Sequence, residues 1–238
     1  MHYFKLILRA CIFLAALLYY LFYRLNAQPF PIDNIHLHWL FMGIWIIYAV
    51  DMAIRIIPFE LESPGCQKVF AENYHSTGLK NTNRQSWFRT FVVLVSWIVL
   101  NAIIGVLYYT NIIDDGIVFL ISLAYGVCDM ICILYFCPFQ TWIMKNRCCT
   151  TCRIYNWDYA MMFTPFIFIP TLYTWSLLTL AILILARWEI TYRFHPERFS
   201  DQSNAYLKCQ NCTEKLCKHK KQLQGFLKKH KDRFQHKK

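Results

Sequence analysis

The sequence predicts an all-α membrane protein that crosses the lipid bilayer several times as a helical bundle. Of its 238 residues, 57% are hydrophobic and only 16% are charged, whereas a soluble domain of this size usually carries about 25% charged residues. Four uninterrupted apolar stretches, and a fifth broken by prolines, each approach the roughly 20 residues that a helix needs to cross the hydrocarbon layer. Lipid offers the backbone no hydrogen-bond partner, and the alternating pattern of a β-barrel strand is absent, so these stretches are expected to be helices.

The predicted transmembrane domain covers residues 1–190 and contains four full spans and a fifth, proline-broken segment. The approximate bounds are 5–23, 35–59, 87–110, 116–139 and 158–187. The first segment resembles a secretory signal, because two basic residues precede it, but Leu25-Asn26-Ala27 is a poor cleavage site, so we expect a retained helix. Asp114-Asp115-Gly116 forms a tight turn, which predicts an antiparallel hairpin of the third and fourth spans.

The fifth segment is longer than a single crossing needs and carries Pro165 and Pro170. Each proline removes a helix hydrogen bond and clashes with the preceding turn. Two conformations follow from this. The segment is either one kinked and tilted span, or a half-helix that enters the membrane, turns near Pro170 and returns.

The charges of the loops predict which side each loop faces. The 60–89 and 141–157 loops are basic, whereas the 111–115 loop contains only acidic charges. Because cytoplasmic loops carry an excess of Lys and Arg, we expect the N-terminus and both basic loops in the cytoplasm of a cell. Five simple crossings would then put the basic C-terminal tail outside. A re-entrant fifth segment returns the tail to the cytoplasm, so we prefer that conformation and expect a multi-pass protein of the cell membrane.

The tail, residues 191–238, is the second predicted unit and the most basic part of the chain. From Glu189 to Lys238 there are 13 Lys or Arg against 5 Asp or Glu, which accounts for most of the net charge of +11. A basic run beside a membrane usually binds anionic lipid headgroups. No nucleic-acid-binding motif accompanies the charge, so nucleic acid is not an expected partner.

Eleven cysteines include two C-x-x-C turns that flank the fifth segment. The four residues are Cys149, Cys152, Cys209 and Cys212. Two such turns can place four thiolates around one metal, as in zinc sites and iron–sulfur clusters. The metal cannot be chosen from its ligands alone. Three spare donors lie nearby, namely Cys148, Cys217 and His219. The alternatives are a structural zinc that only attaches the tail to the 141–157 loop, a redox-active cluster or thiol pair, and disulfides or unbound thiols.

Charged residues within the spans predict an intramembrane polar pocket. Asp51 and Arg55 are four residues apart, so they share a helix face and are expected to pair. Asp129 has no basic residue in its own span, so its partner is expected to be Arg9, Arg55 or Arg89 from another helix. A charge in the membrane is costly and normally faces a partner or a water-filled cavity. The pocket of Asp51, Arg55, Asp129 and Arg89 is therefore either a path for a proton, an ion or a headgroup, or a salt-bridge network that holds the helices together.

Cys128 and Cys132 lie one helical turn apart beside Asp129. Free cysteine in a core behaves as a small hydrophobe, so we favour packing over a ligand pair for these two thiols.

Three functions remain from different classes. The first is a membrane redox protein whose thiolate-bound metal, zinc or iron–sulfur, exchanges electrons with a membrane redox partner. The second is a metal-ion carrier, and the third is a non-catalytic membrane subunit with a structural zinc. The chain has no phosphate loop, dinucleotide fingerprint or nucleophilic serine elbow, which argues against a nucleotide-driven pump or a soluble-type hydrolase.

Overall fold

A computed structural model describes residues 2–26, 35–58, 64–79, 86–146, 148–212 and 217. Within these residues the regular elements are helices. Five of the described helices are long and apolar enough to cross a membrane. They are α1 (His2–Leu25), α2 (Ile35–Ile56), α4 (Trp87–Tyr109), α5 (Asp115–Leu134) and α7 (Leu172–Phe194). The predicted class, a polytopic helical membrane protein, is compatible with this architecture.

Two ends of α5 show how the local sequence sets its length. Asp114 caps the helix, because its side chain accepts a hydrogen bond of 2.9 Å from the amide of Ile117. At the other end α5 stops at Leu134, five residues before the predicted bound of 139. Pro138 follows, and a short π-helix over Phe139–Ile143 replaces the last predicted turn. Proline cannot donate the hydrogen bond that would continue the helix.

The fifth predicted segment is broken where the prolines indicated. The helix α6 (Asp158–Phe163) runs into a 3-10 helix over Thr164–Phe168. Ile169, the residue before Pro170, has an extended backbone (φ −111°, ψ 94°), as expected before proline. A capping box of Thr171 and Thr174 then starts α7. The part before Pro170, α6 and the 3-10 helix, is short. The part after it, α7, is a full-length helix that ends seven residues beyond the predicted bound of 187.

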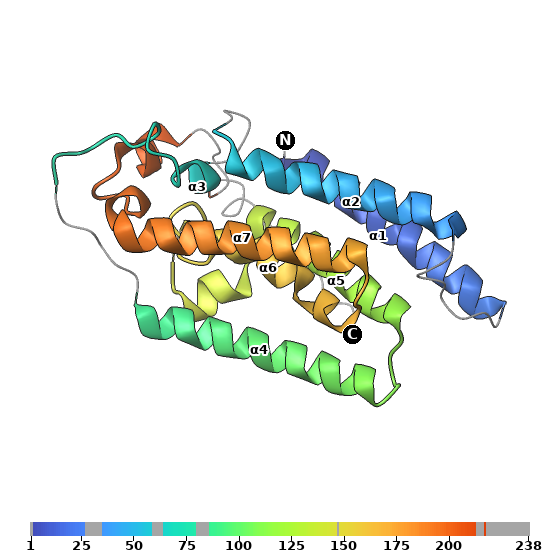
Figure 1. Ribbon diagram of the computed structural model, residues 1–238. Coiled ribbons are helices and arrows are strands. Elements are labelled where there is room, and N and C mark those ends of the chain that lie inside the picture. Colours follow the sequence, from blue (N-terminus) through green and yellow to red (C-terminus); the bar gives the residue numbers. More distant parts are fainter. Residues whose placement is uncertain are drawn as a thin grey trace, which may run out of the picture.

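Because the chain reverses direction between α6 and α7, the loops and the described part of the tail gather at one end of the bundle, which we call the loop end (Figure 1). The loop after α2, the loop after α5 and the segment after α7 all lie there. Backbone hydrogen bonds join Thr77 to Ser203 at 3.1 Å and Ala205 to His75 at 2.7 Å. The part of the tail up to residue 212 is thereby attached to the 64–79 loop.

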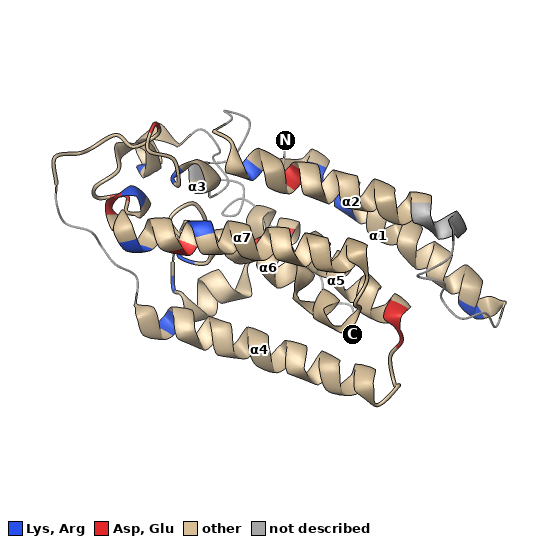
Figure 2. Cartoon of the chain, viewed as in Figure 1, with Lys and Arg blue, Asp and Glu red and all other residues tan. Residues whose placement is uncertain are grey.

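Charge is distributed unevenly along the bundle (Figure 2). Most of the visible Lys and Arg lie toward the loop end, where Asp and Glu are visible as well, whereas the start of α5, at the opposite end, is acidic. The predicted contrast between basic and acidic connections thus corresponds to two ends of the folded chain. The compartment that each end faces remains a prediction.

The helix α5 is central, since α1, α6 and the 3-10 helix all pack on it. In contrast, α4 contacts chiefly the 3-10 helix and the π-helix, and stands away from α7 (Figure 1). Gly105 of α4 permits the close contact with the 3-10 helix, because a Cβ there would come within 2.7 Å of the Phe168 ring. This arrangement leaves space between α4 and α7.

Candidate functional site

The buried charges converge on Arg9 of α1, which is only 4% exposed. Its guanidinium donates to a carboxylate oxygen of Asp129 at 2.9 Å, to one of Asp51 at 3.1 Å and to the carbonyl of Gly126 at 3.1 Å. The prediction that Asp129 finds a basic partner on another helix is confirmed, and that partner is Arg9.

The predicted pairing of Asp51 with Arg55 is wrong. Asp51 instead accepts from Lys5 at 2.8 Å and from the hydroxyl of Tyr159. Arg55 donates to Asp158 at 2.7 Å, with both side chains buried, and its guanidinium lies 4.5 Å from the centre of the Tyr159 ring. If Asp51 paired with Arg55 within α2, the charges of α1 and α6 would be left uncompensated. Asp51 therefore pairs with α1, and Arg55 pairs with α6.

The cluster is electrically balanced. It contains three cations and three anions, namely Lys5, Arg9, Arg55, Asp51, Asp129 and Asp158. Together they connect α1, α2, α5 and α6. Removing one member of a buried pair leaves an uncompensated charge, which typically costs about 3–5 kcal/mol. This geometry favours the salt-bridge network over an ion path.

Arg89, the fourth predicted member of the pocket, lies elsewhere. It is exposed near the start of α4 and donates to the carbonyl of Met144 at 3.1 Å. Because α4 stands away from the core at the loop end, this side chain lines a surface cavity rather than the charge cluster.

The structure does not bring the four predicted metal ligands together. Cys149 and Cys152 are buried on one turn, with the amide of Cys152 donating to the carbonyl of Cys149 at 3.0 Å. Cys209 is exposed and Cys212 is half-buried, both in the tail. Among the described residues, no three His, Cys, Asp or Glu stand close enough to hold a metal ion. The metal site stays a prediction, without support from this geometry.

The spare donors add no support for such a site. The Cys148 thiol shares a hydrogen bond of 3.0 Å with the hydroxyl of Thr150. Cys217 is half-buried, and His219 lies outside the described residues.

Cys149 and Cys152 lie beside thiols from the end of α5 instead. A cavity of about 300 Å³ is lined by both of them together with Cys132 and Cys137. The thiol of Cys137 lies beside that of Cys132. The sulfur of Cys137 accepts from the amide of Gln140 at 3.4 Å, and the Cys149 thiol donates to the Gln140 side chain at 2.9 Å. We call these four cysteines the thiol cluster.

The sequence did not predict this grouping. Cys128 is more exposed but lines the same cavity one turn before Cys132, and Cys137 lies beside Cys132 as well. The unwinding after Leu134 brings Cys137 back toward α5. Burial raises the pKa of the Cys152 thiol to about 11, so this residue is protonated at neutral pH.

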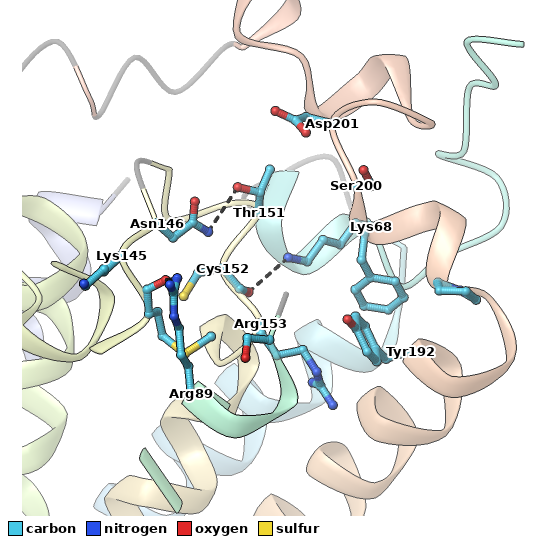
Figure 3. A pocket seen from close by; sticks show the side chains of 14 residues that line it. Lys68, Arg89, Lys145, Asn146, Thr151, Cys152, Arg153, Tyr192, Ser200 and Asp201 are labelled. Atoms are coloured by element: carbon cyan, nitrogen blue, oxygen red, sulfur yellow. Dashed lines mark hydrogen bonds between the residues drawn. The ribbon is translucent and has the colours of Figure 1, made fainter. Parts of the chain in front are cut away.

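A second cavity, of about 350 Å³, opens at the loop end (Figure 3). Its labelled side chains come from the 64–79 loop, the start of α4, the loop after the π-helix and the segment around the end of α7. Four are basic and one is acidic, namely Lys68, Arg89, Lys145, Arg153 and Asp201. Cys152 lines this loop-end cavity as well as the thiol cavity.

Lys68 was expected to be an ordinary loop charge, but it is 1% exposed. Its ammonium donates to the carbonyl of Thr150 and lies 4.8 Å from the centre of the Trp188 ring. Burial lowers its pKa to about 8, although the nearby Cys152 thiol acts in the opposite direction. Nothing in the sequence of this loop distinguished Lys68 from the solvated lysines.

The lowered pKa of Lys68 predicts a pH dependence of stability. Between pH 8 and 10.5 the unfolded chain holds a proton on Lys68 that the folded chain has released, so the contribution of Lys68 to stability rises with pH. We expect the unfolding temperature of the parent, relative to that of Lys68→Met, to be higher at pH 9.5 than at pH 7.5. Thermal unfolding in detergent at both pH values measures this, and an unchanged difference would contradict the burial of a charged lysine.

Comparison with protein-family models, curated proteins and solved structures found no match to this chain.

Proposed function

We propose that this protein is a membrane thiol–disulfide redox protein in which Cys132 and Cys137 alternate between dithiol and disulfide. The observation that supports this is that one cavity is lined by Cys132, Cys137, Cys149 and Cys152, with Gln140 hydrogen-bonded to both the Cys149 thiol and the Cys137 sulfur. Cys149 and Cys152 form the second dithiol, with which the first exchanges.

Cys137 is the attacking thiol in this proposal. The amide of Gln140 donates to its sulfur, and a hydrogen bond to the charged form favours the thiolate. The thiolate attacks one sulfur of a substrate disulfide, which breaks that bond and leaves a mixed disulfide with Cys137. Cys132 then displaces the second substrate sulfur. Two electrons and the two cysteine protons pass to the substrate, which leaves as a dithiol, and a Cys132–Cys137 disulfide remains.

The protonated state of Cys152 suits a resolving thiol rather than an attacking one. Its place between the two cavities gives a substrate at the loop end a route to the thiol cluster. We assign the loop end to the cytoplasm of the cell, on the basis of its basic loops. In that reducing compartment, disulfides are usually transient and catalytic, which agrees with a reversible pair.

Thiol–disulfide exchange is favoured here over a zinc or iron–sulfur centre. A structural metal needs four ligands at short, fixed distances, and no three donors among the described residues converge in that way. The carrier hypothesis is also disfavoured, because the charges that were to form its path neutralise one another.

A redox titration tests the proposal. Purified full-length protein is equilibrated with graded ratios of reduced and oxidised dithiothreitol, and free thiols are then blocked with N-ethylmaleimide. We expect Cys132 and Cys137 to lose their label together, with a single midpoint potential, in peptide mapping by mass spectrometry. The variant Cys132→Ser should lose this two-thiol step, whereas Cys11→Ser, which removes an exposed cysteine of α1, should keep it.

Two results would overturn the proposal. One is full labelling of Cys132 and Cys137 at the most oxidising ratio while the protein remains folded. The other is one equivalent of bound zinc or iron in the purified protein that is lost in Cys149→Ser, because a metal centre would then occupy these thiols.

A further inference from the structure

Beside the loop-end cavity lies a larger and less polar space between α4 and α7. This groove has a volume of about 810 Å³, and Arg153 and Tyr192 line both spaces. Most of its other lining side chains are aromatic or aliphatic, namely Trp87, Phe91, Leu94, Trp157, Ile190 and Phe194, and Thr90, Glu189 and Arg193 complete the lining. The groove lies between two helices that are long and apolar enough to cross a membrane, where acyl chains of a bilayer would reach it. A ligand that fills both spaces must therefore be polar at one end and apolar at the other.

The polar end favours an anion. Arg153 is already paired with Glu189 at 2.7 Å and stacks 3.8 Å from the centre of the Tyr192 ring, so it adds little free charge. Arg89 is exposed and uses one donor on the carbonyl of Met144, and its guanidinium has further donors for a ligand. Lys145 is exposed as well, and Asp201 is the single acidic residue in the lining.

The start of α4 adds to this preference. Ser86 precedes the helix and lines the cavity, but its side chain makes no capping hydrogen bond. The first amides of a long helix attract anions, and phosphate in particular. Ser86, Arg89 and Lys145 line the same cavity.

We propose that the loop-end cavity and the groove together bind a phosphate-bearing amphiphile. The phosphate lies between Arg89 and Lys145 (Figure 3), and the acyl chains lie between α4 and α7. The cavity volume is within the range of small-molecule sites, which is about 300–1,000 Å³. This site shares Cys152 with the thiol cluster, but the side chains proposed to hold the lipid, Arg89, Lys145 and Leu94, take no part in thiol exchange.

The proposal is tested by titrating purified protein with dioleoyl phosphatidic acid, with phosphatidylcholine of the same chains as reference, and counting bound lipid by native mass spectrometry. We expect phosphatidic acid to bind more tightly. Substituting Arg89→Gln and Lys145→Gln together should weaken its binding by about tenfold or more, since each basic residue at a membrane surface contributes roughly 1 kcal/mol toward an anionic lipid. Leu94→Trp should weaken both lipids by filling the groove.

A matched control separates the cavity from the general charge of the loop end. Lys208→Gln removes a charge from the same end but outside the cavity, and should leave binding unchanged. If Lys208→Gln lost as much affinity for phosphatidic acid as the Arg89 and Lys145 variant, the lipid would be held only by the general positive charge of the surface, and the proposed site would be wrong. A second binding measurement uses inorganic phosphate in place of the lipid. If it binds as tightly as phosphatidic acid and Leu94→Trp has no effect on either, the cavity takes a free anion and the amphiphile is wrong. Unfolding temperatures of all variants show whether each remains folded.

Discussion

Replacing Arg9 with Met is expected to destabilise the bundle strongly. Arg9 joins α1 to Asp51 of α2 and Asp129 of α5, and its side chain is almost fully buried. Asp51 retains Lys5 in the variant, but Asp129 loses the partner that the structure gives it. A stranded buried charge costs about 3–5 kcal/mol. Unfolding in detergent, followed by circular dichroism, measures the loss.

Two further variants show whether the loss comes from the stranded carboxylate. Arg24→Met changes the same residue type on the same helix, but Arg24 is 63% exposed and 3.8 Å from Asp114, so its loss should cost less than about 1 kcal/mol. Adding Asp129→Asn to Arg9→Met should recover part of the stability, because no carboxylate is then stranded. If Arg9→Met were as mild as Arg24→Met, the charge cluster would not hold the helices together.

The second large effect is expected at Arg55 and Asp158, which connect α2 to α6. Single substitutions, Arg55→Met or Asp158→Leu, should each cost about 3–5 kcal/mol, because each breaks a buried ion pair by removing one of its members. The double variant should cost clearly less than the sum of the two. The double-mutant cycle formed by these variants should then yield a coupling free energy between Arg55 and Asp158 at the upper end of the usual range of about 0.5–3 kcal/mol.

The pair Arg153 and Glu189 supplies the comparison for this cycle. It has similar bidentate geometry, but the Glu189 side chain is 36% exposed at the loop end. Water screens such a pair, so its coupling should be smaller. Additive costs at Arg55 and Asp158 would contradict the assigned pairing.

Long apolar segments were predictable because the bilayer sets both their length and their helical state. The break at Pro170 was also predictable, since proline constrains the backbone wherever it stands. In contrast, the end of α5 was predicted five residues too late, because the apolar residues before Pro138 continue after the helix stops. Composition indicates what tolerates lipid, but the local hydrogen bonds decide where a helix ends.

The charge cluster and the thiol cluster were harder to predict, because their residues are far apart in the sequence and meet only in the folded chain. The i, i+4 spacing of Asp51 and Arg55 describes one helix, whereas the partners of both come from other helices. Asp158 begins the fifth segment near the depth of Arg55, and matching charges by depth could have found this pair. The C-x-x-C spacing identified Cys149 and Cys152, but no pattern linked them to Cys137.

Labelling of intact cells with a membrane-impermeant maleimide tests both proposed sites at once. Each site requires that the loops and the tail share one side of the membrane and that this side is the cytoplasm. Cys209 is exposed at the loop end, and Ile112, which is 67% exposed, marks the opposite end as Ile112→Cys. We predict that Ile112→Cys is labelled in intact cells and that Cys209 is labelled only after permeabilisation. Labelling of both without permeabilisation, or of Cys209 alone, would contradict a cytoplasmic loop end.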